Sequence, residues 1–220
     1  MAEHSIEQVV AAWAAAGAAV RTGRGVPAQQ LVAAQERLGR PLPGEVSALY
    51  RATDGVDIGP GTLVLHPLLG SDEDLGVVEA ADTYRSWGWE IPDELVVLGS
   101  DAGDRVYGVW APSGARRTLV VVAEESLEGP ALAVVGTSLA GFLAAWTAYH
   151  LPRSRGETAE VAACLDLLEV PRGLRDGESE FDEEHLHALL AWASPGLPDE
   201  EPDPSARPVP ARRLDELARG

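Results

Sequence analysis

Hydrophobic positions in the first quarter of the chain recur at the spacing of helices. Apolar residues between positions 6 and 20 fall on one helical face, and Ser5 precedes them as a suitable N-cap. A second, shorter pattern runs over residues 27–38 and stops at Gly39. A third begins at Leu42-Pro43 and ends at Asp54-Gly55, where glycine can adopt the left-handed conformation of a helix C-cap. These patterns predict three helices before the first strand.

The middle of the chain changes to short β-prone runs separated by glycine, proline and aspartate. The runs cover residues 62–66, 95–98, 105–110, 118–123 and 131–135. Short connections favour antiparallel pairing, because parallel strands need long crossovers. The stretch 77–87 is ambiguous, and its spacing favours a helix. We therefore expect an α+β fold with an antiparallel sheet of five or six strands, flanked by helices.

The clearest helical pattern follows the last predicted strand. Its apolar positions recur between Leu139 and Tyr149, and Leu151-Pro152 is expected to end it. Ser138 follows a strand and opens this helix, as the nucleophile of a Gly-x-Ser-x-Gly elbow does, but the glycine spacing does not match. An N-cap is the better interpretation of Ser138.

Residues 151–220 differ in composition from the rest of the chain. They carry 8 Arg and 16 acids, a net charge of -8, against 9 Arg and 19 acids, or -10, in residues 1–150. Two amphipathic helices are predicted around residues 161–168 and 186–193, which could pack on the core. Residues 195–210 are acidic and proline-rich, which favours disorder, and residues 212–219 predict a weak terminal helix. We divide the chain into residues 1–150, 151–194 and 195–220.

The overall charge is strongly negative. The chain has 17 Lys and Arg against 35 Asp and Glu, a formal net charge of -18. Nucleic acids and anionic membranes require a basic surface, so neither is an expected partner, whereas a basic protein is. The alternative is that the acids serve solubility alone. Cys164 is the only cysteine, so it cannot form an intramolecular disulfide, and the first twenty residues lack the basic start of a signal peptide. A reducing cytoplasm is the expected compartment.

Sequence motifs for catalysis, phosphate binding and metal binding are weak. A Walker-type phosphate loop requires a lysine, which the chain lacks. His185 and His187 stand two apart on a predicted helix and point in different directions. Asp101 and Asp104 only faintly resemble a calcium loop. We predict no cofactor, no metal and no enzymatic activity, with an uncharacterised hydrolase as the lesser alternative because carboxylate pairs in space are invisible in a sequence.

Tryptophan and acidic loops provide the binding candidates. Six of the residues are tryptophan, a side chain enriched at binding hot spots because it buries a large area with few rotatable bonds. Trp13 and Trp146 fit helix core faces, whereas Trp87 and Trp89 flank a glycine, with a core position as the alternative for both. The candidate partner-binding residues are Asp54, Asp72, Glu73, Asp74, Trp87, Trp89, Asp101, Asp104 and Trp110.

Three blocks in this order and spacing resemble the SUKH (Smi/Knr-type) superfamily. Leu42-Pro43 leads a helix that ends in Leu-Tyr-Arg-Ala-Thr-Asp-Gly at residues 49–55; a Gly/Asp turn at residues 98–104 precedes a strand; and Ser138 begins a helix that continues through Phe142-Leu143. Together the blocks cover about residues 5–150. Asp54 stands where many members have Asn, and Leu139 stands where Phe is usual.

The resemblance implies an α+β fold of helices around an antiparallel sheet, without catalysis. Many bacterial members are similar to immunity proteins that bind and neutralise a cognate toxin, and yeast-type members act as regulatory scaffolds. We expect an immunity-type protein that binds a basic, possibly nuclease, toxin domain, with the regulatory scaffold as the alternative.

Overall fold

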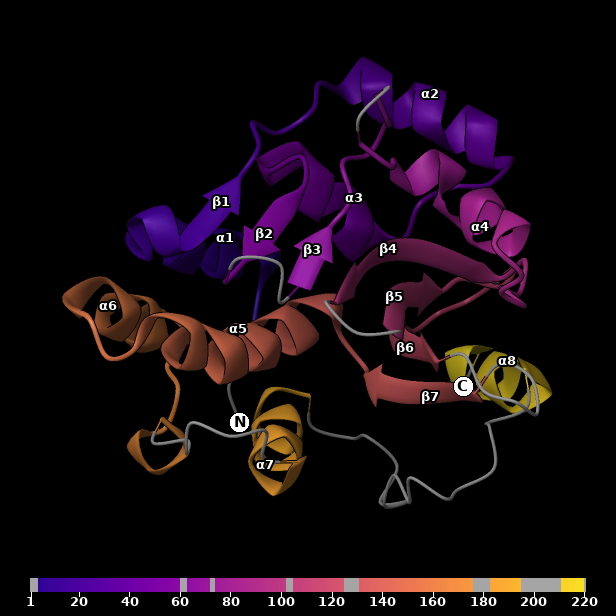
Figure 1. Ribbon diagram of the computed structural model, residues 1–220. Helices are drawn as coiled ribbons and strands as arrows, with labels where there is room; N and C mark the ends of the chain where they lie inside the picture. The colour runs from indigo at the N-terminus through magenta and orange to yellow at the C-terminus, as the bar shows by residue number, and fades with distance from the viewer. Residues whose placement is uncertain are drawn as a thin grey trace.

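A seven-stranded antiparallel sheet forms the centre of the protein in a computed structural model, which describes residues 4–59, 63–71, 74–101, 105–124, 131–175, 183–194 and 211–219 (Figure 1). The strands are β1 (Val20–Thr22), β2 (Val56–Ile58), β3 (Leu63–Leu65), β4 (Leu95–Asp101), β5 (Arg105–Trp110), β6 (Leu119–Glu124) and β7 (Ala131–Gly136). Each strand pairs with the next one along the chain, in the order β1 to β7. The predicted α+β class and antiparallel pairing are confirmed.

The number of strands exceeds the predicted five or six. The two additional strands, β1 and β2, have three residues each, and neither lies within a longer β-prone run as β3 does within residues 62–66. Val20 was expected on the first helix, but that helix ends at Ala15 and Val20 pairs with Ile58. The apolar side chain of Val20 is buried as predicted, although it belongs to a strand and not to a helix.

Eight α-helices surround the sheet in the described part of the chain. They are α1 (Ile6–Ala15), α2 (Ala28–Leu38), α3 (Gly44–Ala52), α4 (Val77–Ser86), α5 (Leu139–Arg155), α6 (Ala159–Leu167), α7 (Glu183–Ala193) and α8 (Ala211–Arg219), with 3-10 turns η1 (Gly17–Ala19) and η2 (Arg172–Leu174). The ambiguous stretch 77–87 is thus a helix, and the Ser5 and Ser138 caps are confirmed by hydrogen bonds from backbone N–H groups three residues later.

Alternating residues of the central strands divide the core between the two faces of the sheet. On β5, Tyr107 and Val109 face the larger hydrophobic cluster, which also holds residues of α1, α3 and α5. Val106 and Trp110 face a smaller cluster, to which α4 and α8 contribute. Two-residue periodicity produces this division, because successive side chains of a strand point to opposite faces.

The larger cluster extends into the C-terminal helices. α6 packs on α1, and α7 packs on α5, so Cys164 and Leu189 are completely buried there. Gly141 lets α5 and α7 approach closely, since a Cβ at this position would lie 2.2 Å from the carbonyl oxygen of Ala193. α5 also runs to Arg155, past the predicted end at Pro152.

One carboxylate fixes the start of α5 against the N-terminal helices. Glu45 of α3 accepts hydrogen bonds from the Ser138 hydroxyl at 2.9 Å and from the backbone N–H groups of Leu139 and Ala140 at 3.1 Å. The first N–H groups of a helix have no partner within the helix and carry the positive end of its dipole. Glu45 therefore stabilises α5 and connects it to α3.

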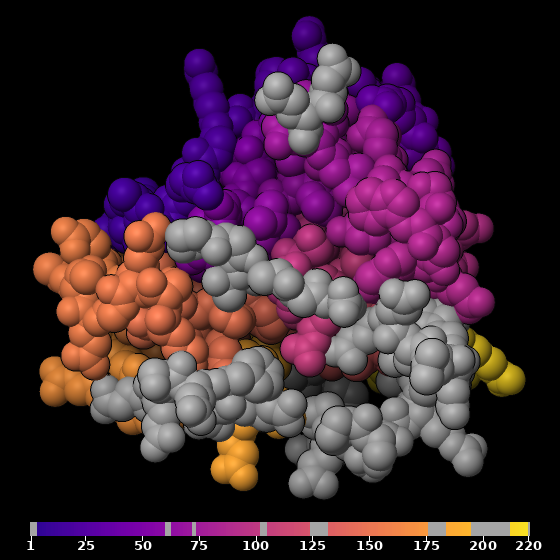
Figure 2. All heavy atoms as spheres, in the orientation of Figure 1, coloured from indigo at the N-terminus to yellow at the C-terminus, as the bar shows by residue number. Residues whose placement is uncertain are grey.

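α4 and α8 lie on the opposite face of the sheet from α5. α4 packs on β4, and α8 packs on β6. In the view of Figure 1, α4 forms the right-hand shoulder of the molecule and α8 lies below it, beside β6 and β7. The space-filling view shows the segment around α4 as a protruding surface (Figure 2).

Candidate functional site

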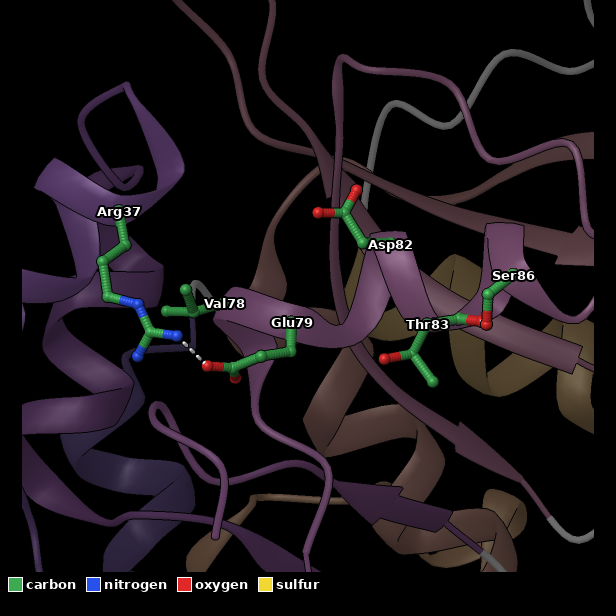
Figure 3. A pocket seen from close by; sticks show the side chains of 6 residues that line it. All are labelled: Arg37, Val78, Glu79, Asp82, Thr83 and Ser86. Carbon is green, nitrogen blue, oxygen red and sulfur yellow. Dashed lines mark hydrogen bonds and ion pairs between the residues drawn. The ribbon is translucent and has the colours of Figure 1, made fainter. Parts of the chain in front are cut away.

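The chemistry of the described surface is richest around α4. A shallow groove of about 590 Å³ runs between α2 and α4, lined by Arg37, Val78, Glu79, Asp82, Thr83 and Ser86. Arg37 of α2 pairs with Glu79 of α4 across this groove (Figure 3). The groove is open and its lining is mixed polar and apolar, so it provides a surface for contact and not an enclosed pocket for a small molecule.

An aromatic corner, made of Tyr84, Trp87 and Trp89, stands at the C-terminal end of α4. The Tyr84 ring is buried and packs edge-on against Trp87 at 5.3 Å and against Trp89 at 5.6 Å between ring centroids. Trp89 is half-buried, whereas Trp87 is 64% exposed. Exposure of that extent leaves most of the Trp87 indole available to a partner, while its edge-on contact with Tyr84 holds it in place.

The local backbone explains why the two tryptophans converge on Tyr84. α4 ends at Ser86, and Gly88 follows with φ of 98°, a left-handed conformation that glycine adopts without strain. The N–H of Trp89 then returns to the carbonyl of Tyr84 at 3.1 Å. The chain turns back over the helix end, which brings both indoles to the same tyrosine.

The segment that carries the aromatic corner is rich in acidic residues. Residues 77–94 contain five acids and one arginine, a net charge of -4. Arg85 donates to Asp82 at 2.9 Å, to Asp93 at 2.8 Å and to the carbonyl of Ile91 at 2.8 Å, and thereby ties the loop after α4 to the helix. The Asp82 and Asp93 side chains are 86% and 94% exposed. These carboxylates are held in place and still accessible.

Two of the predicted binding residues, Trp87 and Trp89, come together in this corner. Asp74 is exposed at the other end of α4, where its N–H bonds the Ser71 hydroxyl at 3.1 Å. Asp72, Glu73 and Asp104 lie outside the described residues.

The other predicted residues have structural contacts elsewhere. Asp54 accepts the Leu68 N–H at 2.7 Å and fixes the loop after β3. Asp101 accepts the Tyr107 hydroxyl at 2.9 Å. Trp110 is 1% exposed, because α8 covers it, so it offers no surface to a partner while α8 is in place.

Sequence reasoning missed Tyr84, Asp82 and Asp93. Once residues 77–87 are taken as a helix, Tyr84 lies three residues before Trp87, on the same face of its last turn. This three-residue spacing is the sequence feature that could have indicated a contact between Tyr84 and Trp87. The clamp formed by Arg85 depends on the path of the loop, which the sequence does not indicate.

Burial strongly affects a histidine beneath the corner. The His66 ring is 8% exposed, with its centroid 6.4 Å from that of Tyr84. Burial lowers the pKa of His66 from 6.5 to about 4. His66 is therefore neutral at pH 7. It adds no positive charge that would offset the acidic residues of the segment 77–94.

The described residues offer no metal centre or membrane-spanning helix. No three His, Cys, Asp or Glu side chains within them approach closely enough to hold an ion. None of the helices in the described ranges has the length and apolar character required to cross a bilayer.

Comparison with protein families agrees with this architecture. The fold is an α+β domain with helices on both faces of an antiparallel sheet. Residues 25–145 match the SMI1 / KNR4 family (SUKH-1). The match covers more than half of the chain, and the protein belongs to this family. No curated protein matches the chain.

Proposed function

We propose that this protein is an immunity-type binding protein that neutralises a basic toxin domain. The exposed indole of Trp87 is the observation that carries the proposal. It belongs to a segment with three exposed acids, Asp82, Glu90 and Asp93, which we call the acidic rim. Membership of the SUKH-1 family is compatible with this role. The protein acts by covering its partner and performs no chemistry of its own.

The aromatic corner supplies affinity in this proposal. Trp87 is packed against Tyr84 before any partner arrives, so few rotations are lost when a partner covers it. Preorganised tryptophans surrounded by polar contacts are typical binding hot spots. A pocket on the toxin that accepts one indole would meet this requirement.

The acidic rim supplies attraction over distance. A nuclease toxin is basic where it holds phosphate, and the net charge of -18 on this chain favours encounter with such a surface. Asp82 and Glu90 lie beside the corner and are exposed. Their contribution should appear mainly in the association rate and should weaken as salt is added.

The absence of catalysis belongs to the same proposal. The buried polar side chains of the described residues are His4, Thr53, His66, Thr147 and Ser194, which include no carboxylate. Burial is one way in which a carboxyl group acquires the raised pKa of a hydrolase acid, and the buried side chains named above offer no such group. The proposal therefore assigns the protein a binding role and no catalytic residue.

The test uses the toxin encoded beside the gene of this protein. Trp87→Ala should weaken the complex by about thirtyfold or more, the loss expected at a hot spot. Leu167→Ala is the matched control, since Leu167 of α6 is also an exposed hydrophobic residue, at 46%. Equal affinities of the two variants would overturn the role of the corner.

A second pair of variants tests the rim. Asp82→Asn with Glu90→Gln should slow association at low salt, and the difference should shrink at high salt. Glu157→Gln with Glu184→Gln removes the same charge at exposed positions of the α6–α7 side and serves as the control. An association rate indifferent to ionic strength would remove the electrostatic part of the proposal.

A regulatory scaffold of the Smi/Knr type is the second candidate. Residues 195–210 contain six prolines and four acids, a composition that suits a tethering segment. Replacing residues 197–208 by Gly and Ser at equal length retains α8 and separates the candidates. Toxin neutralisation should survive this replacement, whereas scaffolding through the segment should not.

A further inference from the structure

The terminal helix α8 sits on a groove formed by other parts of the chain. Leu214 and Ala218 are completely buried, and Leu217 packs against the same cluster. The hydrophobic cluster that receives them also holds Trp110 of β5, Leu119 and Val121 of β6, and Leu132 of β7, and α8 packs directly on β6; this apolar surface is called the groove here. The outward side of α8 is polar, with Arg212 90% exposed. α8 is thus an amphipathic helix seated by one apolar edge.

Two polar contacts fix the direction and register of α8. The indole N–H of Trp110 donates to Asp215 at 3.0 Å. At the end of the helix, the backbone N–H groups of Arg116 and Arg117 donate to the carbonyl of Ala218 at 2.8 and 3.1 Å. The last carbonyls of a helix lack partners within it, so this loop acts as a receptor for a helix C-terminus. The groove therefore selects a helix by polarity as well as by apolar contact.

α8 depends on the groove more than the groove depends on α8. A helix of nine residues is marginal in water, because nucleation is costly and few hydrogen bonds follow. Its own ion pairs, such as Asp215–Arg219, lie at the surface and contribute little. The groove residues, by contrast, belong to long strands within residues 25–145, the range that matches the family, whereas α8 lies outside that range.

We propose that this face of the sheet is a helix-binding groove, that α8 is its intramolecular ligand, and that a partner helix carrying Leu-Asp-x-x-Ala near its C-terminus binds there by displacing α8. The leucine and alanine fill the places of Leu214 and Ala218, and the aspartate accepts the Trp110 indole N–H. This site goes beyond the proposed toxin binding and does not rest on it.

Attachment in the same chain makes α8 an effective competitor. Seventeen residues, 194–210, connect α7 to α8. A tether of this length gives an effective concentration in the millimolar range. A partner helix in solution should therefore bind the full chain roughly tenfold or more weakly than a chain without α8.

The probe for this site is a fluorescent peptide of residues 207–220. We expect it to bind the chain that ends at Pro210, and to bind the full chain at least roughly tenfold more weakly because α8 competes. Peptides with Leu214→Asp or Asp215→Ala should bind much less. A folded shortened chain that ignores the peptide, or that binds all three peptides equally, overturns the proposal.

A second design covers the case in which the shortened chain fails to fold. A protease site replaces residues 199–204 of the full chain, and the protein is cut after folding. The released fragment should exchange with labelled peptide 207–220 but not with its Leu214→Asp form. No exchange overnight, or equal exchange with both peptides, contradicts the groove. If the full chain forms a dimer and Leu214→Asp abolishes it, the groove binds α8 of a second copy. That result would overturn the proposal that a helix of another protein binds there.

Neither result depends on the toxin. If the peptide binds and the Trp87 variant leaves toxin binding unchanged, the helix-binding groove is supported and the role of the aromatic corner in toxin binding is contradicted. If the peptide does not bind and the Trp87 variant weakens toxin binding, the role of the corner is supported and the groove is contradicted.

Discussion

His66 makes the stability of the protein sensitive to mild acid. Its ring is buried beside Tyr84, and its Nε2 atom has no hydrogen-bond partner among the described residues. Burial disfavours the charged imidazolium and lowers its pKa from 6.5 to about 4. The perturbation we consider is a fall from pH 7 to pH 4.5, with and without this imidazole.

The sign and size of the effect follow from the two pKa values. Because the folded pKa is the lower one, the unfolded chain takes up a proton first, and stability falls as the pH drops below 6.5. The loss levels off once the pH passes below about 4. The complete shift corresponds to roughly 3 kcal/mol, and at pH 5 the loss is about 2 kcal/mol. Small domains are stable by only about 5–15 kcal/mol, so this loss is measurable.

Urea unfolding at a series of pH values between 7 and 4.5 measures this loss. His66→Phe retains a buried ring without the titrating nitrogen, and its free energy of unfolding should fall less steeply than that of the wild type, by about 2 kcal/mol at pH 5. His187→Phe is the control, because His187 is exposed. Carboxylates titrate alike in all three proteins and cancel in the comparison. Parallel curves for wild type and His66→Phe would refute the reasoning.

Three further predictions concern the packing around α5 and the single thiol. Gly141→Ala should cost about 1–3 kcal/mol of unfolding free energy, because its Cβ would meet backbone at the end of α7, whereas Gly44→Ala, with open space, should not; equal urea midpoints would contradict this. Glu45→Gln should cost about 1–2 kcal/mol through the weakened cap of α5, compared with a few tenths for Glu7→Gln in the first turn of α1; equal losses in urea would deny the cap. Burial raises the pKa of Cys164 to about 12, so thiol reagents should label it only in denaturant, and rapid native labelling would contradict its burial.

Helices and long strands were predictable because their periodic patterns repeat several times. The helix that begins at Leu139 and its Ser138 cap were predicted from the sequence, although the helix continues to Arg155, beyond its predicted end. β1 and β2 were not predicted as strands, because Val20 continues the apolar face of the first helical pattern and β2 is not part of a longer β-prone run. Their pairing is decided by tertiary contacts with neighbours far along the chain.

The candidate site was predictable only in part. Trp87 and Trp89 were identified by residue type and by the glycine between them. Trp110 has the same side chain, yet α8, about one hundred residues further on, covers it. A sequence pattern can indicate that a terminal helix forms, but the groove that receives it is assembled from strands whose residues are distant in sequence. Asp54 and Asp101 were likewise indistinguishable from binding acids until their hydrogen bonds to Leu68 and Tyr107 were known.

Hydrogen–deuterium exchange of the protein, alone and with the toxin encoded beside it, tests the central claim most directly. A partner seated on the aromatic corner should slow exchange over residues 82–94, which include the end of α4 and the loop after it. The α6 region, including exposed Leu167, should exchange at the same rate in both states. A complex that forms while residues 82–94 exchange as in the free protein would contradict the assignment of this surface.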